Sequence, residues 1–425
     1  MSRATALFIT ACALTRTTEL ATHRLGARFF LPRLFVDRFA VLGGIDPAVF
    51  TDQLDGCRSF RDEDWAGHWT SIAETHLAAA DEALSRLGGP SVEQLFHGAP
   101  GELSAALAPA AEVFADRSPA VLARHLAGST VERDAATAVD NLVKAITYLF
   151  AASWPGWSPA RLRAYTRSRR LFEVLLFALA QGVAVEKLAI PVDGGDTVHA
   201  YAVFPEGTAR VPTVLVSNGL EGTVQEVLLP SLAHRPSGLG LVVMEMPGTY
   251  SYTRPLSGES ENVYRAVIDH LEAHPRVAAD RIGMLGVSFG AYWSTRMAAV
   301  DRRLRAVVSN GALLHHSFQA SATVGMPEIM LWTLAKTTGA RHDLGLGRKL
   351  KALSLRGRYS HITVPLLVIN GDNDTLVSTQ DSIDLADAAP RGELVLYPDD
   401  DHCAMGHYTE WRALAMSWLT THLAP

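Results

Sequence analysis

The sequence predicts an α/β fold, in which a doubly wound, mostly parallel sheet follows an all-helical N-terminal domain. Apolar residues recur with helical spacing up to about residue 183, and short apolar runs then alternate with amphipathic helical segments. Runs that are apolar on both faces are typical of parallel strands covered by helices. We therefore expect an all-helical domain over residues 1–183 and an α/β domain over residues 184–425.

The first part of the chain carries clear helix signals. Asp62–Asp64 places acids at the start of an apolar stripe that runs from Trp65 to Leu77 with the spacing of one buried helix face. Ser118 and Ser158 each precede a proline, so we expect both serines to cap helices. Three further helices are predicted, at residues 119–127, 135–152 and 159–181.

The second part predicts a hairpin and then a parallel sheet. Val185–Val192 and Thr197–Phe204 alternate in polarity and are joined by Asp193–Asp196, a pattern typical of a β-hairpin. Further strands are predicted at residues 213–217, 239–244, 282–285, 306–309, 366–369 and 394–396. Helices are predicted between or after them, at residues 261–272, 291–299 and 410–422 among others.

Composition restricts the partners of this chain. Its 425 residues include 38 basic and 44 acidic side chains, a net charge of −6. This balance disfavours nucleic acid and anionic membranes, because phosphate binding needs clustered positive charge. Cys12, Cys57 and Cys403 leave at least one thiol unpaired, which is typical of a reducing cytoplasm. We expect a cytoplasmic protein with a small-molecule substrate, and leave a homodimer open.

The apolar stretch Ala4–Leu14 superficially resembles the core of a signal peptide. Its charged flank is thin, and cleavage after Ala13 would leave a leader shorter than the usual ~15–30 residues. We predict a buried N-terminal helix there. No apolar run reaches the ~18 residues that a membrane span needs.

The segment Gly286–Gly290 (GVSFG) matches the pentapeptide G-x-S-x-G. It lies between a predicted strand, Arg281–Leu285, and a predicted helix, Ala291–Ala299. In the α/β-hydrolase fold this sharp strand-to-helix turn holds a nucleophilic serine in a strained conformation, and the glycines leave room for close packing. Ser288 is therefore the predicted nucleophile.

A serine nucleophile needs a base and an acid that orients the base, in the chain order Ser, Asp, His. Two acids compete in the loop after the strand at 365–369. We favour Asp374, which lies where the loop turns away, and expect Asp372 to shape the turn. His402 follows the next strand and a short acidic loop, so it is the predicted base, with His407 as its competitor.

The oxyanion formed during attack needs two backbone donors. We predict the N–H groups of Phe289 and of Leu220, because Gly219 lets the loop after the strand at 213–217 approach the serine. The same loop supplies Gly219 and Glu221 as candidate pocket residues.

His315 and His316 are further pocket candidates. Adjacent histidines on extended chain face opposite ways and make a poor metal pair, and the sequence has neither HExxH nor a CxxC pair. We therefore predict no metal and no cofactor. The basic segment Arg161–Arg170 is expected to be a solvated helix face, from which one arginine is a candidate for an anionic substrate.

With these residues identified, the chain resembles the FrsA-like, two-domain α/β-hydrolases, a group that includes 2,6-dihydroxypseudooxynicotine hydrolase and fungal enzymes that shorten polyketide chains. The resemblance implies a serine hydrolase whose pocket lies between cap and core. It also implies chemistry on 1,3-dicarbonyl or aryl-ketone compounds. The matching stretches are residues 65–77 (WAGHWTSIAETHL), 145–172, 218–226 (NGLEGTVQE), 245–249 (EMPGT), 281–290 and 310–316 (NGALLHH).

The chain departs from these relatives at two places. Glu221–Glu226 replaces a loop that often holds a lysine, and Leu313–Thr323 lacks the second acid that some relatives carry.

The hypothesis is a serine-dependent hydrolase that forms an acyl-enzyme from an ester, thioester or β-diketone of a polyketide-like or aromatic molecule. The alternative is a non-hydrolytic elimination, cyclisation or acyl transfer in natural-product biosynthesis. A non-enzymatic binding protein is a third, weaker hypothesis.

Overall fold

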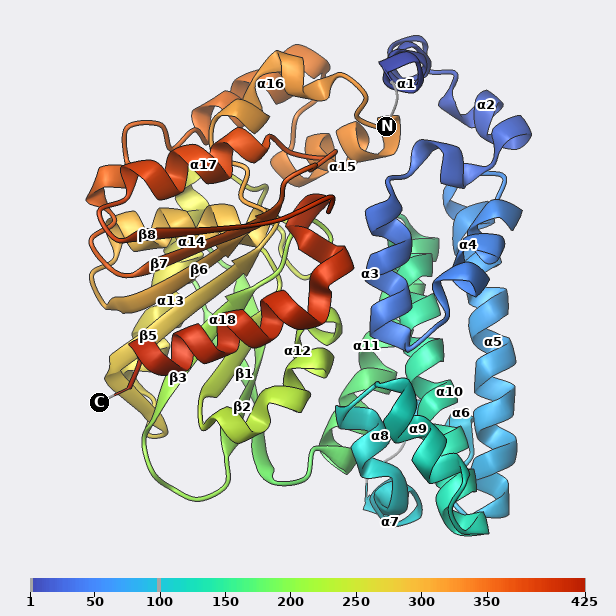
Figure 1. Cartoon of the computed structure of the whole chain (residues 1–425). Coiled ribbons are helices and arrows are strands. Elements are labelled where there is room, and N and C mark those ends of the chain that lie inside the picture. Colours follow the sequence, from blue (N-terminus) through green and yellow to red (C-terminus); the bar gives the residue numbers. More distant parts are fainter. Residues whose placement is uncertain (1–2, 98–100, 425) are drawn as a thin grey trace.

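The computed structural model describes residues 3–97 and 101–424 and confirms the predicted fold class (Figure 1). Its sheet has the strand order β1-β2-β4-β3-β5-β6-β7-β8. β1 and β2 form the expected antiparallel hairpin, β2 is antiparallel to β4, and the remaining strands are parallel. The strands are β1 (Val183–Pro191), β2 (Thr197–Pro205), β3 (Val211–Ser217), β4 (Gly240–Met244), β5 (Val277–Val287), β6 (Leu304–Asn310), β7 (Leu366–Gly371) and β8 (Gly392–Tyr397).

Helices cover both faces of this sheet. Alternate residues of one strand enter different cores: Val214 and Val216 pack toward α12 and α18, whereas Leu215 packs toward α13, α14 and α17. The sheet-region helices are α12 (Val224–Ser231), α13 (Glu261–Ala273), α14 (Phe289–Val300), α15 (Glu328–Thr338), α16 (Asp343–Ala352), α17 (Thr379–Ala388) and α18 (Tyr408–His422).

The helices before the first strand, called here the helical region, lie beside the sheet, with α3 and α11 on the side toward it (Figure 1). Trp65, Trp69, Ala73 and Leu77 of α5 are buried, as their spacing predicts. These helices are α1 (Arg3–Thr15), α2 (Thr18–Leu25), α3 (Arg33–Gly43), α4 (Pro47–Gly56), α5 (Asp62–Arg86), α6 (Val92–His97), α7 (Gly101–Leu107), α8 (Ala111–Ala115), α9 (Pro119–Leu126), α10 (Thr130–Ser153) and α11 (Pro159–Leu179).

Helix capping follows the sequence in one predicted case and departs from it in another. The Oγ of Ser158 accepts a hydrogen bond from the backbone of Arg161, as predicted. The side chain of Ser118 makes no capping bond, and the backbone N–H of Ser118 donates to Asp116 in a local turn. α10 begins five residues before the predicted position, at Thr130, since Ser129 and Glu132 form a capping box that the apolar pattern does not reveal.

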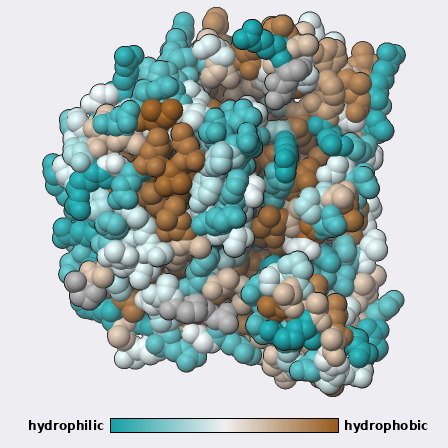
Figure 2. Space-filling model, viewed as in Figure 1, coloured by the Kyte–Doolittle hydropathy of each residue, from teal (hydrophilic) through white to brown (hydrophobic). Residues whose placement is uncertain are grey.

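The N-terminal helix forms as predicted but is less buried than expected. Among the described residues of α1, only Ile9, Cys12 and Ala13 are buried, whereas Leu7 and Leu14 are 64% and 76% exposed. Figure 2 shows apolar residues gathered in patches on an otherwise largely polar face. No helix within residues 3–97 and 101–424 is long and apolar enough to cross a membrane.

The basic segment 161–170 is not a wholly solvated face. Arg161 is 1% exposed and lies inside the helical region. Its guanidinium donates to Asp62 Oδ1 at 2.6 Å, to the carbonyl of Trp154 at 2.6 Å and to the carbonyl of Phe60 at 2.8 Å. The expectation failed because distant backbone carbonyls converge on this side chain, which the local sequence does not show.

Arg161→Met is expected to destabilise the protein, because two buried carbonyls and Asp62 lose their donor. The expected loss of unfolding free energy is on the order of 2–4 kcal/mol, measured by urea denaturation. Arg163→Met is the matched control, since the Arg163 side chain is 66% exposed. A similar, small effect of both substitutions would contradict this role for Arg161.

Candidate active site

Ser288 occupies a sharp turn between β5 and α14. Its backbone has φ 58° and ψ −122°, a conformation that L-residues rarely adopt. A Cβ on Gly286 would collide with the carbonyl of Gly290, and a Cβ on Gly290 would collide with the carbonyl of Ser217. A residue with a side chain therefore does not fit at either position, as the motif predicts.

The structure brings Ser288, His402 and Asp374 together. His402 Nε2 lies 2.8 Å from Ser288 Oγ, and His402 Nδ1 lies 2.8 Å from Asp374 Oδ2. The side chain of Asp374 is fully buried, and its Oδ1 accepts the backbone N–H groups of Leu376 and Val377, each at 2.8 Å. Because Asp374 holds one nitrogen of the ring and Ser288 Oγ lies at the other, His402 can move a proton to and from the serine hydroxyl.

The competing residues lie elsewhere. Asp372 is exposed, and its backbone N–H donates to the carbonyl of Tyr397. His407 directly precedes α18, and its Nδ1 lies 2.8 Å from Asp400 Oδ2. Neither competitor reaches Ser288, whereas Asp374 and His402 do so as a pair.

The acidic loop before His402 holds this histidine in place. Asp401 Oδ1 accepts the backbone N–H of His402 at 2.8 Å and that of Thr375 at 2.7 Å, so it joins the base loop to the acid loop. Asn370 makes a second connection: its side chain accepts the N–H of Cys403 and donates to Asp374. These bonds support the left-handed backbone of Cys403, where φ is 60°.

Burial and charge act in opposite directions on the His402–Asp374 pair. Desolvation lowers the pKa of His402, but the charge of Asp374 and its hydrogen bond outweigh desolvation and raise that pKa well above 6.5. Desolvation raises the pKa of Asp374, and the charge of His402 with several hydrogen bonds brings it below its ordinary value. The acid thus remains ionised beside the base.

The loop after β3 lies directly against the serine. A Cβ on Gly219 would stand 2.6 Å from the Cβ of Ser288, so only glycine fits there. Within the described chain, the backbone N–H groups of Leu220 and Phe289 have no intramolecular partner. Two free donors on either side of the serine are the arrangement that an oxyanion hole needs, and this role for them remains a prediction.

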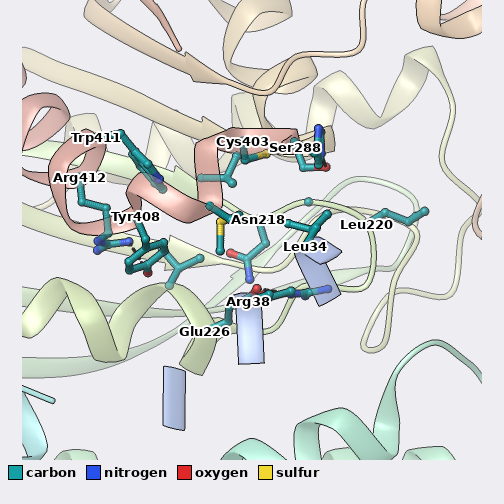
Figure 3. Close-up of a pocket in the computed structure, with 15 residues that line it drawn as sticks. Leu34, Arg38, Asn218, Leu220, Glu226, Ser288, Cys403, Tyr408, Trp411 and Arg412 are labelled. Atoms are coloured by element: carbon teal, nitrogen blue, oxygen red, sulfur yellow. Dashed lines mark hydrogen bonds and ion pairs between the residues drawn. The ribbon is translucent and has the colours of Figure 1, made fainter. Parts of the chain in front are cut away.

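A cavity of about 90 Å³ opens beside Ser288, between α3 of the helical region and the carboxyl edge of the sheet (Figure 3). We call it the serine cavity. Ser288, His402 and Leu220 line it, together with Gly219, one of the four candidate pocket residues. Its other lining residues are Leu34, Arg38, Asn218, Glu226, Val227, Val287, Cys403, Met405, Tyr408, Trp411 and Arg412.

Sequence reasoning missed the charged part of this lining. Arg38 of α3 forms a bidentate ion pair with Glu226 of α12, with Nη2 and Oε2 2.7 Å apart. Glu226 lies within the stretch NGLEGTVQE that carries the family resemblance, which is the one signal that could have drawn attention to it. Arg38 and Arg412 have no local motif, because α3 and α18 meet the cavity only after folding.

Glu221 does not line the serine cavity. It is fully buried, its φ is 58°, and its Oε2 accepts the backbone N–H of Gly156 from the helical region at 3.1 Å. Burial raises the pKa of Glu221 to about 7. The side chain thus connects the loop after β3 to the segment between α10 and α11.

His315 and His316 do not line the serine cavity either. Asp381 of α17 accepts the backbone N–H groups of both histidines and fixes their loop. His315 Nδ1 then lies 2.8 Å from Ser354 Oγ, and His316 Nε2 lies 2.9 Å from Asp384 Oδ2. Within the described residues, no group of three or more His, Cys, Asp or Glu side chains could hold a metal ion.

Glu221→Gln is expected to stabilise the protein at neutral and higher pH. The carboxyl has a pKa of about 7 in the folded state against an ordinary 4.5. The unfolding free energy of the wild type therefore falls as pH rises from 4.5 through 7. The full difference is on the order of 3 kcal/mol above pH 7 and vanishes below pH 4.5. Urea unfolding at several pH values measures it.

The control for this prediction is Glu206→Gln, since Glu206 is exposed. Both variants are compared with the wild type by the difference in unfolding free energy at each pH. If this difference did not change with pH for either variant, the assigned protonation of Glu221 would be wrong.

Known proteins resemble this chain in sequence and in fold. Residues 121–423 match the family model described as Esterase FrsA-like. Esterase FrsA of Photobacterium profundum is 24% identical over 290 residues, which cover 64% of this chain and 69% of that protein. The 2,6-dihydropseudooxynicotine hydrolase of Paenarthrobacter nicotinovorans is 27% identical over 238 residues, which cover 55% of this chain and 64% of that protein. The match thus spans about two thirds of these relatives.

A solved structure shows the same fold over most of the chain. The crystal structure of 2,6-dihydroxy-pseudo-oxynicotine hydrolase superposes with a TM-score of 0.66 at 20% identity and covers 91% of this chain and 95% of its own. AbyA5 superposes with a TM-score of 0.58 at 23% identity, over 67% of this chain and 84% of its own. The family model spans well over half of the sequence, so this chain belongs to the FrsA-like esterase family and is a hydrolase of the α/β type.

Proposed function

We propose that this protein is a serine-dependent hydrolase that uses Ser288, His402 and Asp374 as a catalytic triad. The observation that carries the proposal is the continuous chain of two 2.8 Å hydrogen bonds from the serine hydroxyl to a buried carboxylate. A histidine oriented in this way can activate a serine that is otherwise a weak nucleophile.

In the proposed reaction, His402 Nε2 takes the proton of Ser288 as the hydroxyl attacks a substrate carbonyl. The N–H groups of Leu220 and Phe289 stabilise the oxyanion, and Asp374 stabilises the imidazolium. His402 then gives the proton to the leaving group, which leaves an acyl-enzyme on Ser288. A water molecule, deprotonated by His402, releases the acyl group as an acid.

The serine cavity limits which part of a substrate can lie at the serine. At about 90 Å³, it has room for roughly six to nine non-hydrogen atoms, if each takes the space of one water molecule. This size suits a short chain or a single ring on the acyl side. A larger polyketide-like or aromatic ester, thioester or β-diketone would bind with its remaining part outside the cavity.

A non-hydrolytic elimination, cyclisation or acyl transfer is the second candidate. Its support is the small volume of the cavity and its cover by Leu34 and Arg38 of α3, since a site that excludes water suppresses hydrolysis. Turnover in isotopically labelled water separates the two candidates, because hydrolysis must place solvent oxygen in a product and the non-hydrolytic reactions do not.

Ser288→Ala is expected to lower kcat by at least about 10³-fold and to abolish covalent labelling by a fluorophosphonate, because the attacking oxygen is lost. Mass spectrometry of the labelled protein locates the modified residue. Ser294→Ala is the matched control, since Ser294 lies on α14, the helix that follows Ser288, and its Oγ bonds only to backbone carbonyls. Labelling that persists in Ser288→Ala would exclude Ser288 as the nucleophile.

The pH dependence of kcat/KM is expected to report the titration of His402. The general base must be neutral, and its pKa is raised well above 6.5, so activity should rise with pH through a midpoint on the alkaline side of 6.5. Asp374→Asn removes the charge that raises this pKa, so the midpoint should fall and kcat should drop on the order of 10⁴-fold.

Asp372→Asn serves as the control for Asp374, because it changes a neighbouring, exposed acid in the same loop. It should leave both the midpoint and the rate close to those of the wild type. A shift of the midpoint by Asp372→Asn rather than by Asp374→Asn would reassign the acid of the triad.

A further inference from the structure

The serine cavity is lined by a buried cation that has no ion-pair partner among the described residues. Arg412 of α18 lines the cavity and is 7% exposed. Within residues 3–97 and 101–424, no carboxylate forms an ion pair with it, although many other arginines of the chain have such a partner. Burial of a guanidinium without an anion is costly, so this arrangement needs an explanation.

Neutral groups hold Arg412 in one position. Its Nη1 donates to Tyr408 Oη at 3.1 Å, and its Nη2 donates to Ser231 Oγ at 2.7 Å. Its guanidinium carbon lies 5.2 Å from the ring centre of Tyr408 and 5.7 Å from that of Trp411. These contacts orient the side chain and weakly stabilise its charge, but they do not neutralise it.

Two N–H donors at this end of the cavity have no hydrogen-bond partner. Arg412 Nε and the indole Nε1 of Trp411 are both buried and unpaired in the described chain. Both residues line the serine cavity, where Figure 3 shows them on α18 together with Tyr408. Most buried donors in folded proteins have a partner, so a pair of unpaired donors in the wall of a cavity needs an explanation, such as a bound ion or ligand.

The other charges of the cavity do not compensate Arg412. Arg38 and Glu226 neutralise each other through their bidentate ion pair. His402 is paired with Asp374. The lining therefore has one positive charge in excess, carried by Arg412, and the unpaired N–H groups of Arg412 and Trp411 can donate hydrogen bonds to an anionic ligand.

We propose that Arg412 and Trp411 bind a carboxylate on the acyl part of the substrate while the scissile carbonyl lies at Ser288. This inference rests on the proposed function and names its substrate class: monoesters or thioesters of short dicarboxylic acids. A planar carboxylate suits a guanidinium N–H beside an indole N–H, and a glutaryl group lies within the roughly six to nine atoms that the cavity holds.

The first test measures binding and does not depend on the triad. Glutarate is titrated by calorimetry into the wild type, Ser288→Ala, Arg412→Met and Arg412→Lys. Wild type and Ser288→Ala should bind glutarate alike, and Arg412→Met should bind at least about tenfold more weakly, because a charge-assisted bond is lost. Arg412→Lys keeps the charge without the planar fork, so its affinity should lie between them.

Arg265→Met is the matched control for the loss of one positive charge. Arg265 lies on α13, against the opposite core of the sheet, and pairs with Glu261. It should bind glutarate as the wild type does. Absence of glutarate binding to the wild type, or equal loss in Arg265→Met and Arg412→Met, would overturn the proposal.

The second test measures specificity. Hydrolysis of a glutarate monoester is compared with that of its methyl-ketone isostere, in which a methyl group replaces the charged oxygen. Wild type should prefer the anionic ester by at least about tenfold in kcat/KM, and Arg412→Met should lose this preference with little change toward the ketone. An equal fall of kcat/KM toward both esters in Arg412→Met would mean that Arg412 has only a structural role and would refute the proposal.

The two tests separate the proposals from each other. Glutarate binding without hydrolysis of any ester would refute the proposed function and support the anion site. Hydrolysis of the neutral ester that depends on Ser288, without glutarate binding, would support the triad and refute the anion site.

Discussion

Close packing around Ser288 is the constraint on which the rest of the site depends. Gly286, Gly290 and Gly219 each lack the Cβ that would collide with a neighbour at the serine turn. Only this proximity lets β5 deliver the serine at the carboxyl edge of the sheet, where the loops after β7 and β8 deliver Asp374 and His402. Parallel strands end at one edge, so residues far apart in the chain meet there.

The helical region is joined to the sheet region by polar contacts as well as by apolar packing. Arg38 binds Glu226, Gly156 donates to Glu221, and Tyr165 donates to both carboxylate oxygens of Glu245. Each of these acids lies at the carboxyl side of β3 or β4, close in sequence to the loops that form the site. The position of α3, and hence the shape of the serine cavity, therefore depends on buried charges of the sheet region.

Buried charges differ in how completely they are compensated. Asp374 and His402 satisfy each other, and so do Arg38 and Glu226. Glu221 reduces the cost of burial by holding its proton up to a pH of about 7, because burial raises its pKa. Arginine has no such option at physiological pH, because its pKa is too high. This difference is why the unpaired Arg412 points to an external anion, whereas the half-paired Glu221 does not.

The sequence by itself determined the parts of the protein that depend on local pattern. Strand and helix order, the serine turn and the choice of Asp374 over Asp372 follow from periodicity, glycine positions and distance from strand ends, all of which lie within a few residues. Only the tertiary structure decided the burial of Arg161, the placement of His315 and His316 away from the cavity, and the contribution of both α3 and α18 to its lining. The reason is physical: burial, pairing and desolvation of a side chain are set by groups that are distant in the chain and adjacent only in space.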